Sequence, residues 1–145
     1  MSSHIQTFIV NNIQTYDKDI EFIHKHNTKD KPLNILFSGA IDKFVCISWF
    51  YETNLNCLWI KDNVPYNTYT NPKFKELIKK YSDNYPSAIM FGMSMGGLGA
   101  LLHSQYIANC AAVNSAKKPP AVDVLPPIAA STEPPPSESY SIRPL

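Results

Sequence analysis

Short apolar runs alternate with polar segments along the first 116 residues, and most of these runs have the length of a β-strand. The first two show partial period-two alternation, with polar turn material between them at residues 11–18. The later runs are more continuous, which is typical of strands buried on both faces of a sheet. The predicted strands cover residues 4–10, 19–26, 32–40, 56–60, 87–91 and 110–116.

One long segment has the period of a helix instead. Asn71 can cap this helix, and Pro72 suits its first position. Its apolar residues then fall on one helical face: Phe74, Leu77, Ile78 and Tyr81. A second helix is predicted from Gly97 to about Asn109, whereas the pattern of residues 42–53 leaves helix and irregular loop both open.

The alternation of strands and helices predicts the α/β class, with a parallel sheet covered by flanking helices. Residue usage changes near residue 116, so we expect a domain at 1–116 and a separate tail at 117–145. The tail holds eight of the 12 prolines and no asparagine, and such a composition favours a disordered, extended chain. Two interpretations of the tail stay open: a segment that binds an SH3-like groove, or a frameshift or fusion product without a role.

Charge and cysteine content exclude several classes of function. The formal net charge is +1, which gives no electrostatic reason to expect binding to nucleic acid or to an anionic membrane. No apolar run is long enough for a membrane-spanning helix. Three well-separated cysteines suggest neither a disulfide framework nor a zinc site. We therefore expect a cytoplasmic protein that needs no metal and no cofactor.

Candidate chemistry is concentrated in residues 92–97, Gly-Met-Ser-Met-Gly-Gly, between a predicted buried strand and a predicted helix. Ser94 lies at the tight turn between these two elements. Side chains in place of Gly92 and Gly96 would collide in such a turn, so we take these two and Gly97 as the glycines that shape it. The turn lifts the serine hydroxyl above the edge of the sheet, where the N–H groups at the start of the helix favour negative charge.

This pattern resembles the nucleophile elbow of the α/β-hydrolase family. The resemblance implies that Ser94 attacks an ester, thioester or amide carbonyl to give an acyl-enzyme. It also implies an oxyanion hole whose first donor is the backbone N–H of Met95. The second donor in the family comes from the loop after the third strand, here residues 37–42, so the N–H of Gly39 or Ala40 is the candidate.

The rest of a catalytic triad is not found where the family would place it. In the family's chain order, an acid and then a histidine follow the serine. After Ser94 the only histidine is His103, which lies too early, inside the predicted helix, and is expected to be a packing or surface residue. The acids after Ser94 all lie in the proline-rich tail: Asp123, Glu133 and Glu138. The resemblance therefore covers residues 1–116 and predicts an amino-terminal, truncated hydrolase domain.

Two functional hypotheses follow from this combination. The first is a serine hydrolase for a small-molecule acyl substrate, inactive or weakly active because the acid and the histidine are missing. The second is a non-catalytic truncated protein, or an interaction module that uses the tail. In either case the apolar edge strand at 110–116 favours self-association. A nucleotide-binding loop is disfavoured, because the glycines are followed by no P-loop lysine and lack the G-x-G-x-x-G spacing.

Three further groups have a structural interpretation beside a functional one. Asp62 is expected to cap its loop rather than face a substrate. The aromatic residues at 49–51 are expected to pack in the core rather than line a pocket. The lysines of the predicted helix at 71–83 are expected to form a solvated surface.

Overall fold

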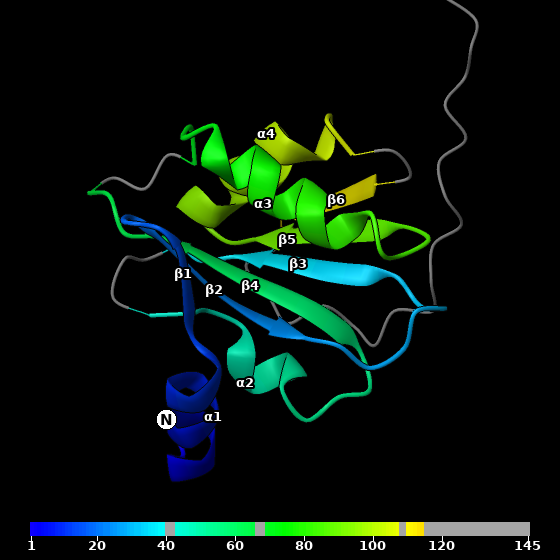
Figure 1. Cartoon of the computed structure of the whole chain (residues 1–145). Coiled ribbons are helices and arrows are strands. Elements are labelled where there is room, and N and C mark those ends of the chain that lie inside the picture. Colours follow the sequence, from blue (N-terminus) through cyan, green and yellow to red (C-terminus); the bar gives the residue numbers. More distant parts are fainter. Residues whose placement is uncertain (40–42, 66–68, 108–109, 115–145) are drawn as a thin grey trace, which may run out of the picture.

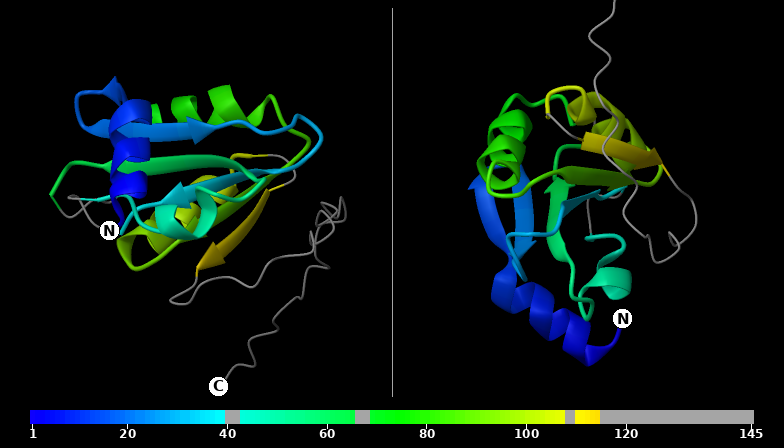
Figure 2. Two further views of the ribbon diagram at one scale, coloured as in Figure 1. Left: turned by 90° about the horizontal axis from the view of Figure 1, so that it is seen from below. Right: turned by 90° about the vertical axis from the view of Figure 1, so that its right-hand side faces the viewer.

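The computed structural model describes residues 1–39, 43–65, 69–107 and 110–114. Within these ranges six strands form one sheet, in the order β1-β2-β4-β3-β5-β6. Helices α3 and α4 cover one face of the sheet, and α1 and α2 lie on the other (Figure 1 and Figure 2). The strands are β1 (Gln14–Asp17), β2 (Ile20–Lys25), β3 (Leu33–Phe37), β4 (Asn56–Asp62), β5 (Ala88–Gly92) and β6 (Cys110–Asn114). The helices are α1 (Ser3–Asn12), α2 (Ile47–Phe50), α3 (Lys73–Ser82) and α4 (Met95–Ser104).

Strands β4, β3, β5 and β6 run parallel to one another, whereas the β1–β2 hairpin joins β4 in the antiparallel direction. The α/β class and the mostly parallel sheet predicted from the sequence are therefore confirmed. β3 and β4 are buried along their whole length, since helices cover both of their faces. The crossover between them, which the sequence pattern leaves undecided, contains the short helix α2.

Two apolar clusters lie on opposite faces of the sheet. One cluster joins Ile35 of β3 to Phe74 of α3. The other joins Trp59 of β4 to Ile5 of α1 and Phe50 of α2. Successive residues of a strand point to opposite faces, so each central strand contributes to both clusters and ties the two helical layers together.

The segment at residues 4–10 belongs to α1, and the predicted strand there is wrong. Ile5, Phe8 and Ile9 lie three and four residues apart, so all three fall on the helix face that packs toward the sheet. The Phe8 ring lies 5.9 Å from the Trp59 ring in an edge-on arrangement. This tertiary contact favours the helical period in a segment whose apolar residues fit both periods.

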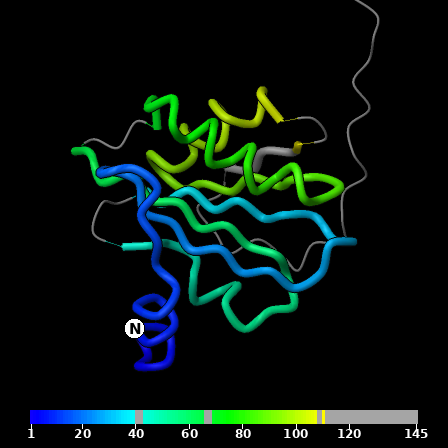
Figure 3. The backbone as a smooth tube through the Cα atoms, viewed as in Figure 1, coloured from blue at the N-terminus to red at the C-terminus, as the bar shows by residue number. Residues whose placement is uncertain are grey.

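The polar segment at residues 11–18 is a second correction, because it contains β1 and is not turn material alone. The chain leaves α1 and turns back through the β1–β2 hairpin, as the tube in Figure 3 shows. β1 is an edge strand with a single neighbour in the described sheet. Its backbone pairs with β2 although its own side chains are exposed or half-buried, so no apolar pattern reveals it.

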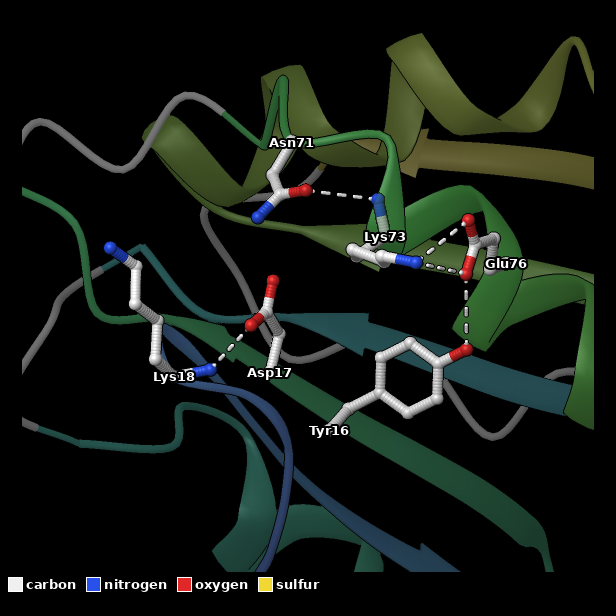
Figure 4. A network of polar contacts seen from close by, with 6 residues as sticks. All are labelled: Tyr16, Asp17, Lys18, Asn71, Lys73 and Glu76. Carbon is white, nitrogen blue, oxygen red and sulfur yellow. Dashed lines mark hydrogen bonds and ion pairs between the residues drawn. The ribbon is translucent and has the colours of Figure 1, made fainter.

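The helix predicted from residue 71 is α3, and Asn71 caps it as expected. The Asn71 Oδ1 atom accepts a hydrogen bond of 2.9 Å from the backbone N–H of Lys73 (Figure 4). The lysines of α3 are exposed, which confirms the predicted solvated face. On this face Lys73 forms an ion pair with Glu76, which also accepts a hydrogen bond of 3.4 Å from the Tyr16 hydroxyl of β1.

The carboxy-terminal part of the described chain is α4 and β6. α4 begins at Met95 and ends at Ser104, so the predicted helix from Gly97 to Asn109 is placed too late. β6 pairs on one side only within the described residues, and the expected self-association through this edge stays a prediction. The proline-rich tail at 117–145 lies outside the described residues. The described residues include all three cysteines, and none of them is in a disulfide. None of the described helices has the length and apolar character of a membrane span.

Replacing Ile5 with alanine should lower the free energy of unfolding by about 2–4 kcal/mol, because removing this buried side chain leaves a cavity between α1 and the sheet. Val10 on the same helix is 64% exposed, so Val10→Ala should change that free energy by less than about 0.5 kcal/mol. Urea unfolding followed by circular dichroism measures both variants. Equal losses in the two would contradict the helical assignment of this segment.

Candidate active site

The turn between β5 and α4 holds Ser94 in an unusual backbone conformation. β5 ends at Gly92 and α4 begins at Met95, so only two residues connect them. Ser94 has φ 53° and ψ −126°, and its side chain is exposed. A positive φ in a residue other than glycine costs about 1–3 kcal/mol of conformational free energy. Such a conformation persists only where the surrounding structure enforces it. The sequence places this serine at the apex of a strand-to-helix turn, and the structure does the same.

Backbone contacts enforce the turn. A Cβ atom added to Gly92 would lie 2.0 Å from the Gly96 carbonyl oxygen, and one added to Gly96 would lie 2.2 Å from the Phe37 carbonyl oxygen. No side chain fits at either position, because the opposing atoms belong to rigid backbone. The Gly96 N–H donates to the Met93 carbonyl at 2.9 Å. The Gly97 N–H donates to the Ser94 carbonyl at the same distance, which closes the first turn of α4.

The loop after β3 lies directly beside this turn. β3 and β5 are parallel neighbours, and Phe37 is the register partner of Gly92 at the end of both strands. A Cβ atom added to Gly39 would lie 2.4 Å from the Met93 carbonyl oxygen and 3.4 Å from the Ser94 Cβ. The predicted donor Gly39 is therefore next to the predicted nucleophile. Ala40, the other predicted donor, lies outside the described residues.

Two backbone N–H groups beside Ser94 are free to bind an anion. Met95 is the first residue of α4, where the N–H groups have no partner inside the helix. Within the described part of the chain, no hydrogen-bond acceptor is found for the N–H of Met95 or of Gly39. The N-terminus of α4 adds a partial positive charge at the same place. An oxyanion hole is built from N–H groups of this kind, so Met95 and Gly39 remain the predicted donors.

His103 is a packing residue, which is one of the two roles expected for it. Its side chain is buried, and its ring stacks on the Phe37 ring at a centroid distance of 5.9 Å. The Nε2 atom lies 2.9 Å from the Tyr69 carbonyl oxygen. A carbonyl only accepts hydrogen bonds, so Nε2 carries the proton and donates it. Burial lowers the pKa of His103 and outweighs the hydrogen bond to the Tyr69 carbonyl, which raises it; nearby Lys75 lowers it further, and the ring is neutral at pH 7.

The other histidines also lie away from the turn. His24 and His26 each lie 2.9 Å from the Tyr85 hydroxyl, which comes before the amino end of β5, whereas Ser94 follows its carboxyl end. His4 is exposed on α1. Among the described residues, which include all four histidines of the chain, none forms a hydrogen bond with Ser94.

Asp62 caps its loop, and the structural interpretation of this residue is confirmed. It is buried at the carboxyl end of β4, and β3 lies between β4 and β5 in the sheet. Its Oδ1 atom accepts a hydrogen bond of 3.0 Å from the Val64 N–H, and its Oδ2 atom accepts one of 3.2 Å from the Tyr69 N–H. Both oxygens are thus used to hold the segment between β4 and α3.

The aromatic segment at 49–51 packs as expected. Phe50 is buried, and Trp49 and Tyr51 are partly buried against the cluster on the α1 side of the sheet. The Lys25 ammonium group donates to the carbonyls of Phe50 and Tyr51 at 3.0 and 2.9 Å. These contacts satisfy the carbonyl end of α2, and none of them involves Ser94.

Cys46 is the other potential nucleophile near the turn. Its sulfur lies 3.6 Å from the Met93 sulfur. Burial raises the pKa of the Cys46 thiol to about 11, so it is not a thiolate at neutral pH. A protonated thiol is a poor nucleophile, so the structure does not favour Cys46 over Ser94 as the candidate nucleophile.

Tyr69 is the residue of this region that the sequence analysis misses. It lies between β4 and α3, is completely buried and has φ 54°. Its hydroxyl donates a hydrogen bond of 2.5 Å to the Ser38 carbonyl, next to Gly39. No signal in the sequence points to this role, because the partner is 31 residues away and the segment around Tyr69 has no periodic pattern.

Comparison with known proteins supports the fold of the site. No protein-family model matches the sequence, and no curated protein matches it. Two solved structures share the fold. One is the glycosylation associate protein (Gap123) complex from Streptococcus agalactiae, with TM-score 0.51 and 17% identity, covering 64% of this chain and 21% of that chain. The other is the capsule O-acetyltransferase of Neisseria meningitidis serogroup A, with TM-score 0.50 and 21% identity, covering 68% of this chain and 47% of that one.

These likenesses establish the α/β fold and no more, because both identities are low. The chain spans about a fifth of the length of the first structure and about half of the second. Within the part of the chain that the structure describes, no three histidine, cysteine or carboxylate side chains converge as metal ligands would.

Gly96→Ala should lower the free energy of unfolding by about 1–3 kcal/mol, because the added methyl group meets the Phe37 carbonyl. The sign is informative, since the same change in an open helix raises stability by about 1 kcal/mol. Chemical denaturation measures the difference. Ser104→Ala, at the other end of α4, serves as the control, and a stabilising effect of Gly96→Ala would show that α4 does not touch β3.

The buried, neutral His103 should make stability fall as the pH is lowered. An unfolded histidine has a pKa of about 6.5, whereas the pKa of His103 is lower in the folded protein. The unfolded state therefore binds more protons as the pH falls through about 6.5, and the free energy of unfolding decreases there. His103→Gln keeps a donor for the Tyr69 carbonyl but does not titrate.

Denaturation of the unmodified chain and of His103→Gln between about pH 8 and pH 5 measures this contribution. The variant should show a shallower dependence on pH. His24, whose pKa burial also lowers, should account for part of the remaining slope. Identical slopes in the two proteins would mean that His103 is charged, or exposed, in the folded state.

Proposed function

We propose that this chain carries an acyl-transfer site in which Ser94 is the nucleophile. The Ser94 Oγ atom forms a bond to the carbonyl carbon of an ester, thioester or amide, and the leaving group departs with the serine proton. The acyl group is then passed to water or to an acceptor hydroxyl. The observation that carries the proposal is the exposed serine with positive φ at the β5–α4 turn, a conformation that backbone contacts on both sides enforce.

The surroundings of Ser94 support this chemistry. The negative charge of a tetrahedral intermediate would lie next to the free N–H groups of Met95 and Gly39. One of the two solved structures with this fold is titled a capsule O-acetyltransferase, a protein whose reaction is also an acyl transfer. The predicted alternative, an interaction module that uses the proline-rich tail, depends on residues outside the described ranges.

The rate of the proposed reaction should be low at neutral pH. A serine hydroxyl is a weak nucleophile without a base, and no histidine is hydrogen-bonded to Ser94. Hydroxide ion is able to take the proton instead, so acylation should become faster as the pH rises. Ser94 is exposed, so an activated acyl group in solution is able to reach its hydroxyl.

A fluorophosphonate should form one covalent adduct with the chain, on Ser94, as the serine oxygen displaces fluoride from phosphorus. Intact-protein mass spectrometry measures the rate, and peptide mapping locates the adduct. We expect labelling to accelerate between about pH 7 and pH 9, because hydroxide replaces a general base. Ser94→Ala should abolish labelling.

Ser104→Ala is the matched control, since it removes a half-buried serine hydroxyl from the other end of α4. It should label at the rate of the unmodified chain. Labelling in denaturant should be lost, because the reactivity belongs to the folded turn. An adduct that persists in Ser94→Ala, or no adduct at any pH, would refute the proposed function.

A further inference from the structure

Tyr69 joins three parts of the fold at the site. Its N–H donates to the Asp62 carboxylate at 3.2 Å, and its carbonyl accepts the His103 Nε2 proton at 2.9 Å. Its hydroxyl donates to the Ser38 carbonyl at 2.5 Å, with a longer contact of 3.4 Å to the Ile60 carbonyl. The residue therefore connects the carboxyl ends of β4 and β3 with helix α4.

The conformation of Tyr69 needs all of this support. Its φ of 54° is a left-handed conformation that a bulky side chain rarely adopts. The ring is completely buried, edge-on to the Phe37 ring at 5.1 Å. A Cβ atom added to Gly99 would lie 2.7 Å from this ring, so α4 also leaves space for it. A strained conformation of this kind persists only where the surrounding structure enforces it.

The Ser38 carbonyl and the Gly39 N–H belong to the same peptide group. In a trans peptide the carbonyl and the N–H point in opposite directions, and the described chain contains no cis peptide bond. A hydrogen bond that fixes the Ser38 carbonyl therefore also fixes the direction of the Gly39 N–H. This N–H belongs to the residue whose added Cβ would lie 3.4 Å from the Ser94 Cβ.

The direction of the Ser38 carbonyl depends on partners inside the protein. Ser38 is fully buried, so water cannot replace a lost partner of its carbonyl. Its own N–H is fixed by the Ile60 carbonyl at 3.0 Å, and its hydroxyl accepts the Val45 N–H at 3.2 Å. The peptide between Ser38 and Gly39 is the next one along the chain, and the Tyr69 hydroxyl donates a hydrogen bond to its carbonyl.

We propose that Tyr69 is a positioning residue of the acyl-transfer site: its hydroxyl holds the Ser38–Gly39 peptide so that the Gly39 N–H donates to the oxyanion formed at Ser94. The proposal rests on the proposed function of Ser94. It predicts that the Tyr69 hydroxyl affects the reaction although it touches neither the nucleophile nor the substrate.

Tyr69→Phe removes only the hydroxyl and keeps the ring in the core. The rate constant for phosphonylation of Ser94 should fall about 10- to 100-fold, because one oxyanion donor is misdirected. The dependence of that rate on pH should keep its shape, since the ionisation of Ser94 is not altered. Tyr85→Phe is the matched control: it removes a tyrosine hydroxyl that contacts two histidines at the opposite end of β5, and it should leave the rate unchanged.

A second measurement tests the same proposal without relying on the stability of the variant. The chain has five glycines, so selective ¹⁵N-glycine labelling gives a simple amide spectrum. In the unmodified chain, phosphonylation should move the Gly39 amide proton downfield, because it donates to the phosphonyl oxygen. The shift should be absent in the labelled Tyr69→Phe variant.

The outcomes separate the two proposals. If the unmodified chain forms no Ser94 adduct, the proposed function itself fails. If the adduct forms but the Gly39 amide does not respond to it, Gly39 is not a donor and the role of Tyr69 is refuted. If folded Tyr69→Phe is less stable but labels at the original rate, Tyr69 is only a structural residue. A slower rate together with the loss of the Gly39 shift supports the positioning role.

Discussion

The structure depends on a contact between backbones that leaves no space for a side chain. Where β3 and β5 end, the start of α4 lies directly against the Phe37 carbonyl, and the Gly92 backbone lies directly against that of Gly96. Any Cβ atom at these glycines would push α4 away from the sheet. The same contact forces the positive φ of Ser94 and brings Gly39 beside it. Ser94, the proposed nucleophile, and Gly39, the proposed oxyanion donor, are therefore placed by one steric constraint and not by separate loops.

The parts of this arrangement that follow from local chemistry were predictable from the sequence. The apolar pattern of the buried strands and of α3 is clear in the sequence. The turn around Ser94 is also recognisable, because the two glycines whose backbones touch, Gly92 and Gly96, are only four positions apart. α1 was not predictable, since Ile5, Phe8 and Ile9 fit a helix while Ile5, Thr7 and Ile9 also fit a strand. Only the contact of α1 with Trp59 decides between them. β1 was missed because an exposed edge strand carries no apolar pattern.

The candidate site is predictable to the same extent. The loop-capping role of Asp62 follows from the local chemistry of aspartate, whose oxygens bind N–H groups a few residues further on. The role of Tyr69 does not, because its hydroxyl bonds to a carbonyl 31 residues earlier. Such a contact exists only after β3, β4 and α4 have packed together. Sequence reasoning therefore proposes a nucleophile, Ser94, but does not reveal the contacts of Tyr69 beside it.

The fold accounts for the position of Ser94, the proposed nucleophile, but within the described residues it brings no histidine to Ser94 that could activate it. Each histidine is accounted for: His103 is fixed on the Tyr69 carbonyl, His24 and His26 bind Tyr85, and His4 is exposed on α1. A histidine base for Ser94 would have to come from outside these 145 residues. In serine proteases that lack a triad member, the oxyanion hole and substrate binding alone still give about 10³- to 10⁴-fold catalysis over water. In the proposed function, the turn, Gly39 and Met95 would provide such a contribution. Chemistry at Ser94 should then depend more on the direction of backbone N–H groups than on any side chain that the described structure brings to it.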